Sequence, residues 1–470
     1  MDVPTPGKPP YQGFCDAAHF DHDGIDVALR HRFGSRLSES RPSRVDRETD
    51  VPSALTLPKS SPLTSSWPET PPGADPLPGQ LDRWLAARGA ELVAIRRHIH
   101  AHPELSHREF ETADLVARKL KAAGLSPRFL PRGNGVICDV GRGDRVVALR
   151  ADLDALPLPD TKDVPYRSTV DGAAHACGHD VHTTILLGVG MALAQLAERD
   201  ELPGRVRLLF QPAEEAMPSG APEVISAGGL KDAVAIFALH CAPQLPVGLV
   251  GVRSGPFTAA ADTVEVKLTG RGGHTARPHL TADLVNALGR VVVDVPSLLD
   301  RRVDPRAGLS MVWGVVRAGE AYNAIPIEGQ AKGTLRVLNR DAWRDAPQLI
   351  TQLIKDVVAT TGAGVEVKYT RGVPPVVNDR MATAIIAGAA GAALGADRVV
   401  EAEISMCGED FAFYLDHVPG TMIRLGTGIP GSEVKMDIHQ SGFDVDERAI
   451  GYGVRVMVHT ALGALSAGAF

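Results

Sequence analysis

Residues 175–182 read HACGHDVH, and the apolar stretch TTILLGVGMALAQLAE (183–198) that follows them predicts a helix. Strands that alternate with helices favour a largely parallel sheet with helices on its faces. The predicted fold class is therefore α/β. The strand-like apolar runs on the two sides of this segment are GVICDV (135–140), RVVALRAD (145–152), RVRLLFQ (205–211) and AVAIFALH (233–240).

Side chains of metal-ligand type crowd the HACGHDVH stretch. Cys177 and His179 lie two residues apart, and His175, Asp180 and His182 surround them. Such crowding costs free energy unless something neutralises and orders the groups. The stretch therefore predicts a metal site.

Three separate clusters, AEE (213–215), ALH (238–240) and IHQSGF (438–443), add further ligands to this prediction. Taken alone, a histidine in either of the last two would more often be a surface residue or a satisfied core residue. The whole set is larger than one tetrahedral zinc needs, and it suits two metals that share a bridging ligand. The candidate ligands are Cys177, His179, Glu215, His240 and His439.

The pair Glu214-Glu215 follows the apolar run RVRLLFQP (205–212), so it is expected at the end of a buried strand. Two adjacent carboxylates in that position repel each other unless one of them binds a cation. We therefore expect Glu215 to bind metal and Glu214 to act in catalysis. On charge statistics alone, the pair would belong to a solvated loop.

The length and composition suit a chain that buries more than one core. The chain has 470 residues, of which 44% are hydrophobic and 22% charged, so two domains are expected. A net charge of −7 gives no reason to expect nucleic acid or a membrane surface as a partner. No apolar run reaches the roughly 18–20 residues of a membrane span.

Cysteine usage points to the compartment. The five cysteines have no disulfide-framework spacing, which favours a reducing, cytoplasmic location. Cys138, Cys241 and Cys407 are expected to be small buried packing residues.

The chain divides into four segments. Residues 1–78 are rich in Pro, Ser and charge and are predicted to be a disordered extension rather than a signal peptide. Residues 79–258 are assigned to the first part of a catalytic metal-binding domain and residues 373–470 to its second part. Residues 259–372 between them are predicted to be an inserted domain.

The inserted segment has its own pattern of elements. In order, the pattern is strand, helix, two strands, helix and strand, which is the ferredoxin-like βαββαβ arrangement. The predicted ranges are 263–269, 281–294, 309–317, 329–338, 341–360 and 364–370.

Two helices are predicted ahead of the first strands. An apolar stripe at helical spacing marks the first of them. The second is expected to begin at Ser106, with Glu109 three residues later completing a capping box, and to end at Gly124. The stripe consists of Leu81, Leu85, Leu92, Ile95 and Ile99.

Nine motifs resemble, in the same order, those of the zinc-dependent amidohydrolase and peptidase family that includes aminoacylases and carboxypeptidase G. Within that family they most resemble the hippurate and indoleacetyl-amino-acid hydrolase subfamily. The resemblance covers residues 80–470. The motifs are RRHIHAHPELSHREFETADLV (96–116), ALRADLDALPL (148–158), HACGHDVH (175–182), LLFQPAEE (208–215), GRGGHTARPH (270–279), AYNAIP (321–326), GTLRVL (333–338), GEDFAFY (408–414) and HQSGFDVDE (439–447).

The resemblance implies two divalent metal ions per subunit, Zn, Mn, Ni or Co, that activate a shared water. Cys177 stands where most of the wider family has a bridging Asp. The resemblance then implies His179 and His439 on one metal, and Glu215 and His240 on the other.

It also implies roles for residues outside the ligand set. Glu214 would take a proton from the water and return it to the leaving amine, and Asp154 would orient a ligand histidine. His274 and Asn323 would stabilise the oxyanion, and Arg336 would pair with the substrate carboxylate. Without the resemblance, an arginine in such a strand is by default part of a solvated face.

The inserted domain is expected to form a homodimer contact, because its open sheet edge offers a surface for pairing. The expected function is hydrolysis of N-acyl or N-aroyl amino acids, which are small molecules. One alternative is a dipeptidase or aminopeptidase, which would need a pocket acid for the free α-amine of its substrate. Another is a non-catalytic binding protein that keeps the fold; Glu214 and the full ligand set argue against it.

Overall fold

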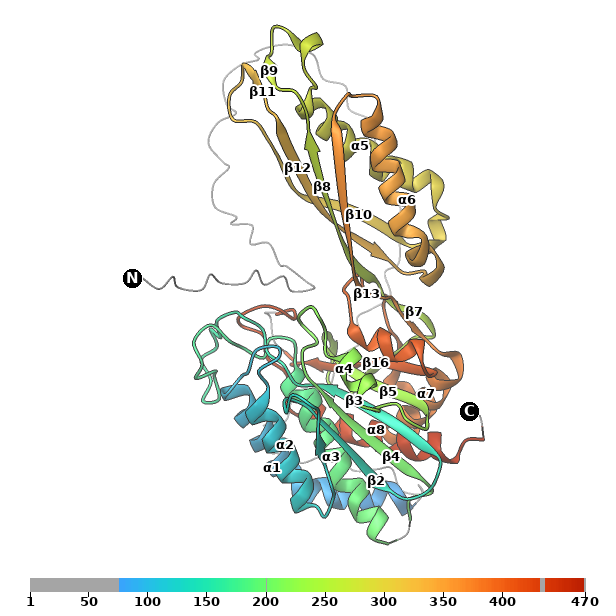
Figure 1. Cartoon of the computed structure of the whole chain (residues 1–470). Helices are drawn as coiled ribbons and strands as arrows, with labels where there is room; N and C mark the ends of the chain where they lie inside the picture. Colours follow the sequence, from blue (N-terminus) through green and yellow to red (C-terminus); the bar gives the residue numbers. More distant parts are fainter. Residues whose placement is uncertain (1–75, 200, 432–435, 469–470) are drawn as a thin grey trace, which may run out of the picture. The chain divides into compact units, whose positions relative to one another are not determined.

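The structure, a computed structural model, describes residues 76–199, 201–431 and 436–468. Its largest sheet has eight strands in the order β1-β2-β4-β3-β5-β16-β6-β15. The central strands β4 (Arg205–Gln211), β3 (Val146–Asp152), β5 (Ala233–Pro246) and β16 (Gly420–Gly428) run parallel to one another (Figure 1). The predicted α/β class with a largely parallel sheet is confirmed.

Shorter strands extend this sheet at both ends. On one side, β1 (Arg128–Phe129) and β2 (Val136–Gly141) are added antiparallel. On the other, β6 (Val250–Val252) pairs antiparallel with β16 and parallel with β15 (Val399–Glu401). Because the central strands are parallel, their carboxyl ends meet at one edge, where open α/β sheets place their sites.

Six helices accompany the eight-stranded sheet in the described part of the chain. The central one, α3 (His179–Glu198), packs against α1, α8 and β3. It is long and apolar enough to cross a membrane. However, 83% of its most apolar 18-residue stretch is buried inside the fold, which accounts for its composition. The others are α1 (Pro76–Ala101), α2 (Phe110–Ala122), α4 (Ala221–Ser226), α7 (Arg380–Leu394) and α8 (Arg448–Ser466).

The predicted apolar stripe of the first helix is confirmed, since each of its five side chains in α1 is at most 5% exposed. The predicted capping box is wrong. Helix α2 begins only at Phe110, and the hydroxyl of Ser106 donates to Oδ2 of Asp154 at 2.6 Å instead of capping the helix. The Ser106 side chain, which the local sequence pattern predicts to cap the helix, therefore makes a tertiary hydrogen bond instead.

A second sheet has four antiparallel strands in the order β10-β12-β8-β13. In chain order its elements are strand, helix, two strands, helix and strand, so the predicted ferredoxin-like arrangement is confirmed. Helix α5 is longer than predicted and runs through Pro296 to Arg302. The elements are β8 (Ala260–Thr269), α5 (Leu284–Arg302), β10 (Leu309–Ala318), β12 (Glu328–Val337), α6 (Arg340–Ala359) and β13 (Gly364–Val373).

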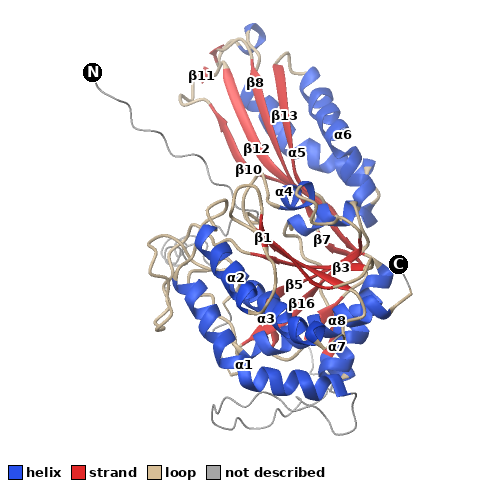
Figure 2. Cartoon of the chain, turned by 60° about the horizontal axis from the view of Figure 1, so that its bottom comes forward, coloured by secondary structure: helices blue, strands red, loops and turns tan. Residues whose placement is uncertain are grey.

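Helices α5 and α6 cover one face of this four-stranded sheet (Figure 2). Alternate side chains of β8, including Val264 and Val266, are buried against Leu288 of α5 and Ile350 of α6 in a hydrophobic cluster of their own. The side chains between them, such as Glu265, are more exposed. One covered face is what the strict alternation of β8 predicts.

The remaining elements are short. Two ribbons, β7 (Gly255–Thr258) with β14 (Val376–Asn378) and β9 (Gly273–His274) with β11 (Ala324–Ile325), are antiparallel. The described ranges also contain four 3₁₀ helices, at Pro278–Leu280, Pro305–Ala307, Ala396–Arg398 and Asp410–Asp416.

The domain limits at 258/259 and 372/373 stay predictions. The predicted disordered extension, residues 1–78, falls outside the described residues except at its end, where α1 begins at Pro76.

Candidate metal centre and active site

The site forms where strands of the large sheet reach their carboxyl ends. Asp152 is the last residue of β3 and Asp154 follows it, while Glu214 and Glu215 follow β4. The strand-like run predicted over 233–240 is too short, because β5 continues beyond His240 to Pro246. His240 therefore projects from within β5 and not from the end of a strand.

The HACGHDVH stretch bends sharply at its glycine. Gly178 has a φ of 89°, and a Cβ added to it would lie 2.8 Å from Sγ of Cys241. Only glycine fits this close approach and left-handed backbone. The turn presents Cys177 and His179, the first residue of α3, to the same site. Two non-glycine residues with positive φ, Ala213 at 51° and His439 at 64°, flank the site as well.

The five predicted ligands converge. One set of ligand atoms within 4.8 Å of one another comes from Cys177, His179 and His240, and a second comes from Cys177, Glu215 and His439. Cys177 belongs to both sets, as a bridging ligand would. The implied pairing of His179 with His439, and of Glu215 with His240, differs from this grouping.

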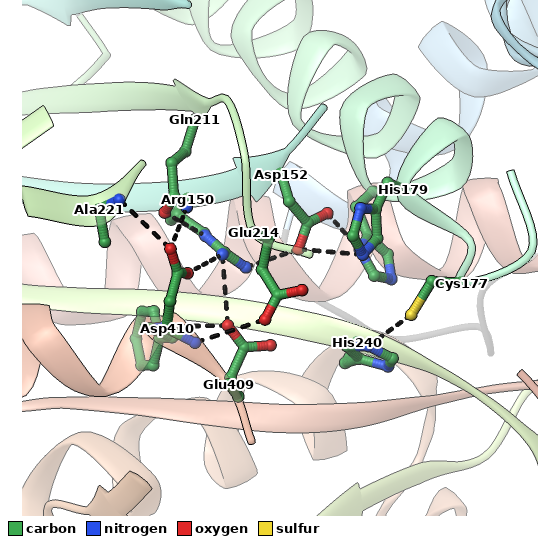
Figure 3. Close-up of polar contacts among 12 residues, drawn as sticks. Arg150, Asp152, Cys177, His179, Gln211, Glu214, Ala221, His240, Glu409 and Asp410 are labelled. Carbon is green, nitrogen blue, oxygen red and sulfur yellow. Dashed lines mark hydrogen bonds and ion pairs between the residues drawn. The ribbon is translucent and has the colours of Figure 1, made fainter. Parts of the chain in front are cut away.

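Distances inside the cluster are short without forming a closed hydrogen-bond network. Sγ of Cys177 lies 3.5 Å from Nε2 of His240 (Figure 3). Oε1 of Glu215 lies 3.2 Å from Nε2 of His439 and 3.8 Å from Nε2 of His179. Oε1 of Glu215 and Nε2 of His179 are both buried and have no hydrogen-bond partner among the described residues. The lone pairs of these unpaired oxygen and nitrogen atoms are therefore available to bind a shared cation.

Backbone carbonyls fix which ring nitrogen faces the cluster. Nδ1 of His179 donates to the carbonyl of Asp154 at 2.9 Å, and Nδ1 of His240 donates to the carbonyl of Cys241 at 2.8 Å. With the proton on Nδ1, each imidazole keeps its Nε2 lone pair for a metal.

Electrostatics favour bound cations. Burial and the charge of Glu215 raise the pKa of Cys177 well above its usual value, and burial and the charges of Glu409 and Glu215 do the same for Glu214. Burial lowers the pKa of His179, but the carboxylates of Asp152 and Asp154 outweigh it and raise that pKa to about 10. Buried thiol and carboxyl groups in this state become ligands when a metal supplies the missing positive charge. The donor set therefore fits divalent metal ions.

Asp154 lies where an orienting residue is needed. Its Oδ1 accepts from the backbone nitrogen of Glu214 at 3.1 Å, and its Oδ2 accepts from that of Glu215 at 2.9 Å. Oδ1 also lies 3.3 Å from Nδ1 of His179. One carboxylate thus holds both the acidic pair and the histidine-bearing turn.

A buried arginine, Arg150, pairs with three carboxylates beside the site. Sequence reasoning missed this residue. Arg150 Nη1 contacts Asp152 at 2.6 Å, and its Nη2 contacts Asp410 at 2.6 Å and Glu409 at 3.2 Å (Figure 3). The backbone nitrogen of Asp410 lies 3.4 Å from Oε1 of Glu214. The signal for this group was a charged residue inside the buried strand 145–152, since buried charges need partners.

Asp152 and His182 were also given no role. Oδ1 of Asp152 accepts from Nδ1 of His182 at 2.7 Å, and Nε2 of His182 accepts from the backbone nitrogen of Cys241 at 2.8 Å. Both ring nitrogens of His182 are therefore engaged within the protein. His182 fixes Asp152 beside His179, whose Nε2 lies 3.7 Å away.

His274, Asn323 and Arg336 belong to another part of the chain. His274 lies in β9 and pairs with Ala324 of β11, and the backbone of Thr275 donates to the carbonyl of Asn323 at 3.2 Å, so this ribbon brings His274 and Asn323 together. Arg336 lies in β12, opposite Ser310. None of these three residues is among the described residues that line the cavity beside the candidate ligands.

That cavity is lined by the candidate ligands other than His179, by Glu214 and by further residues of the chain. Its lining residues are Cys177, Glu214, Glu215, His240, Thr258, Ser405, Cys407, Gly408, Glu409, Arg424, Ile438 and His439.

Comparison with known proteins gives relatives over most of the chain. Residues 148–463 match the model of "Peptidase family M20/M25/M40". An N-acetyl-L-cysteine deacetylase of Bacillus subtilis (strain 168) is 36% identical over 368 residues, which are 78% of this chain and 86% of that protein. The crystal structure of Bacillus subtilis YXEP, described as a dinuclear metal-binding peptidase of the M20 family, has a TM-score of 0.70 at 34% identity and covers 80% of this chain and 98% of its own.

A further relative from Rhodococcus jostii (strain RHA1), named "Putative glutamate--cysteine ligase 2-3", is 47% identical over 369 residues, or 78% of this chain. The matched region is only 46% of that protein's length. Its name therefore describes a longer protein.

Proposed function

The chain belongs to peptidase family M20/M25/M40, as its motifs predicted, and from this premise we propose that it hydrolyses the amide bond of N-acyl or N-aroyl amino acids. The products are a carboxylate and a free amino acid. The observation that carries the proposal is the adjacency of Glu214, a buried acid, to a cluster of five ligand side chains. The named deacetylase relative supports an N-acyl substrate.

We assign the metal ligands to Cys177, His179, Glu215, His240 and His439, for two divalent ions of Zn, Mn, Ni or Co. The metals, when bound, polarise the substrate carbonyl and lower the pKa of a bound water. In this assignment Cys177 would hold both ions, because its thiol belongs to both groups of ligand atoms. The relative described as a dinuclear metal-binding peptidase supports the number of metals.

Glu214 is the proposed general base. It takes the proton of the attacking water and delivers it to the nitrogen of the leaving amine. Its side chain is 5% exposed and is held by the backbone nitrogen of Asp410 and, through its own backbone, by Asp154. These contacts keep the carboxylate near the reacting atoms while excluding bulk water.

His274 and Asn323 are the proposed donors to the oxyanion. Nδ1 of His274 accepts from the backbone nitrogen of Ala276 at 3.0 Å, so the neutral ring carries its proton on Nε2 and can donate it outward. His274 is exposed on its ribbon, as a residue that completes another surface must be. We propose that it does so across a homodimer contact of the inserted domain. The cytoplasmic location and the carboxylate role of Arg336 stay predictions.

A dipeptidase or aminopeptidase is less favoured. Such an enzyme needs a cavity acid to hold the free α-amine, and Glu409 is the acid in the cavity beyond the Glu214-Glu215 pair. Its Oε1 is already engaged by Arg150 at 3.2 Å and by the backbone nitrogen of Phe411 at 2.9 Å.

The test is a hydrolysis screen of N-acyl amino acids and of dipeptides with free amines, after the protein has been loaded separately with Zn, Mn, Ni or Co. We expect release of free amino acid from the acylated compounds. Cleavage of the dipeptides alone would establish the rival peptidase. Tight binding of either class without turnover, at full metal content, would establish a binding protein.

A further inference from the structure

Glu109 contacts the turn that carries the acidic pair. The sequence pattern assigns Glu109 to the cap of α2, but its carboxylate makes no hydrogen bond to the first turn of that helix. Glu104 accepts from two nitrogens of that turn instead, at 3.1 and 2.8 Å. Oε1 of Glu109 accepts from the backbone nitrogen of Ala213 at 2.7 Å, and both residues are fully buried. A side chain from between α1 and α2 therefore binds the residue that precedes Glu214.

Ala213 has a backbone conformation that needs support. Its φ is 51°, in the left-handed region that a residue with a Cβ adopts only where its surroundings fix it. The carboxylate of Glu109 binds its nitrogen, and the backbone nitrogen of Gly220 donates to its carbonyl at 2.8 Å. Both backbone polar groups of Ala213 are thus engaged. Glu214 follows directly in the chain, so its direction depends on this turn.

Two carboxylates bind three successive backbone nitrogens here. Glu109 accepts from Ala213, and the two oxygens of Asp154 accept from the residues that follow it, Glu214 at 3.1 Å and Glu215 at 2.9 Å. Successive N–H groups beside a left-handed residue can converge on negative charge in this way. The backbone of the proposed base is therefore held at its own nitrogen by Asp154 and at the preceding nitrogen by Glu109.

The carboxylate of Glu109 is itself held in place. Its Oε1 also accepts from the backbone nitrogen of His107 at 2.9 Å, and its Oε2 accepts from Nδ2 of Asn134 at 2.9 Å. Asn134 is fully buried, and His107, with a φ of 68°, is a second left-handed residue bonded to the same oxygen as Ala213. Three donors converge on one carboxylate, so it has little freedom to move.

The contact with Ala213 needs an acceptor oxygen at the right reach rather than a charge. Burial and the charge of Asp154 raise the pKa of Glu109 to about 8. A proton on Oε2 would leave Oε1 able to accept from the Ala213 nitrogen. Two conservative variants separate reach from charge. Glutamine keeps the reach and an acceptor oxygen, whereas aspartate keeps the charge but is one methylene group shorter.

We propose that Glu109 is a positioning residue for Glu214: it holds the nitrogen of Ala213 and so fixes the turn from which the general base projects. The inference rests on the proposed function, in which Glu214 takes the proton of the attacking water. The hydrogen bonds of Glu109 go to the backbone and to Asn134. Glu109 therefore acts on the base through the chain and not by touching the reacting atoms.

The experiment measures kcat and KM of Glu109→Asp and Glu109→Gln on an N-acetyl amino acid, using metal-loaded protein of measured metal content. Glu109→Asp should lower kcat by roughly 10 to 100-fold with little change in KM, because a misplaced base slows the chemical step more than it weakens substrate binding. It should keep the metal content of the wild type, because Asp154 still holds the nitrogen of Glu215.

Glu109→Gln should keep most of the wild-type kcat and the full metal content. Its Oε1 still accepts from Ala213, and its new Nε2 faces Asn134. Oδ1 of Asn134 has no hydrogen-bond partner among the described residues, so a turn of this amide lets that oxygen accept from the glutamine.

Glu104→Asp is the matched control. It makes the same chemical change in a nearby carboxylate that also accepts from backbone nitrogens, but those nitrogens belong to α2 and not to the acidic turn. It should lower the free energy of unfolding and leave kcat unchanged. Hydrogen exchange followed by mass spectrometry reports on the turn without any substrate. Residues 208–216 should exchange faster in Glu109→Asp than in the wild type or in Glu109→Gln.

Four results would overturn the inference and leave the proposed function intact. They are a wild-type kcat in Glu109→Asp, an equal loss of kcat in Glu109→Gln or in Glu104→Asp, a loss of metal from Glu109→Asp, and exchange of residues 208–216 that Glu109→Asp does not change. A metal-loaded wild type that is inactive on every N-acyl amino acid overturns the proposed function, and the role of Glu109 in positioning the base falls with it.

Discussion

Oδ2 of Asp154 accepts a hydrogen bond from the backbone nitrogen of Glu215 at 2.9 Å. The other oxygen of the same carboxylate holds the backbone nitrogen of Glu214, so a residue that follows β3 sets the direction of two acidic side chains that follow β4. Glu215 is thereby turned toward His439, and Glu214 toward the backbone of Asp410. The Asp154 carboxylate thus holds two residues that are adjacent in sequence so that their side chains face different partners.

The first prediction concerns the base. Glu214→Gln should keep the metal content of the wild type, because Glu214 lies beside the proposed ligand set. Its activity should fall by roughly two to four orders of magnitude, the usual range for lost acid–base catalysis. Amide hydrolysis and elemental analysis on the same sample measure both quantities. Unchanged activity would remove Glu214 from the mechanism.

The second concerns the bridging ligand. Cys177→Ala should lose metal, since the thiol belongs to both groups of ligand atoms. Cys138→Ala is the matched control, because that cysteine is also buried but belongs to none of the groups of ligand atoms found among the described residues. Elemental analysis after exhaustive dialysis against metal-free buffer tests this. Equal metal content in the two variants would sink the bridging assignment.

The third concerns the completion of the site by a second subunit. His274→Ala and Glu214→Gln should each be nearly inactive. Random pairing in a mixture makes half of the dimers mixed, and each mixed dimer holds one intact site, so the mixture should recover up to about a quarter of the wild-type activity. Native mass spectrometry confirms that mixed dimers are present. If they form and stay inactive, His274 acts in its own subunit or outside the chemistry.

The fourth concerns Arg150, which is about 1% exposed and pairs with Asp152, Glu409 and Asp410. Arg150→Met should lower the free energy of unfolding by about 3–5 kcal/mol, because buried carboxylates lose their counter-charge. Arg88→Met, which breaks an exposed pair with Glu91, should cost less than about 1 kcal/mol. Urea unfolding measures both variants. A loss no greater than that of the exposed pair would show that the buried carboxylates do not need Arg150.

The fifth concerns pH. His100 is buried with its Nδ1 2.7 Å from Asp180 and its Nε2 3.3 Å from Asp160. Burial lowers the pKa of His100, but the two carboxylates outweigh it and raise that pKa above its usual value of about 6.5. A raised folded-state pKa gives stabilisation that is complete below the unfolded pKa and lost as pH rises through the folded pKa.

The difference in free energy of unfolding between the wild type and His100→Gln should therefore be largest below about pH 6 and shrink as pH rises through the folded pKa. Urea titrations at a series of pH values follow it. A difference that stays constant with pH would mean that His100 is not charged in the folded protein.

Sequence pattern predicted those parts of the fold that depend on periodicity. The stripe from Leu81 to Ile99 and the alternation of β8 are local, so they identify their elements directly. Ser106 shows the limit. Its local pattern is that of a helix cap, but a carboxylate 48 residues away binds the hydroxyl, and no local rule contains that partner.

The convergence of the candidate ligands could be anticipated because cysteine and histidine in clusters have few other uses. The residues that contact and orient these candidates could not be anticipated. Arg150 and Asp410 are 260 residues apart in sequence, and only the fold brings them together. Thr258 is similar, since a threonine at the end of a short strand is common, and its unmet hydrogen bond is visible only once the chain is folded.

The pairing of β7 with β14 has a consequence for how this chain can be divided. These strands are the segments through which the chain enters and leaves the four-stranded sheet, and they are hydrogen-bonded to each other. The interval between them, residues 259–375, is described throughout and contributes no strand to the eight-stranded sheet. A short turn from Thr258 to Val376 would thus excise that interval as a cassette, and cassettes from relatives could be exchanged at the same two points while the proposed metal ligands, all outside the interval, stay in place.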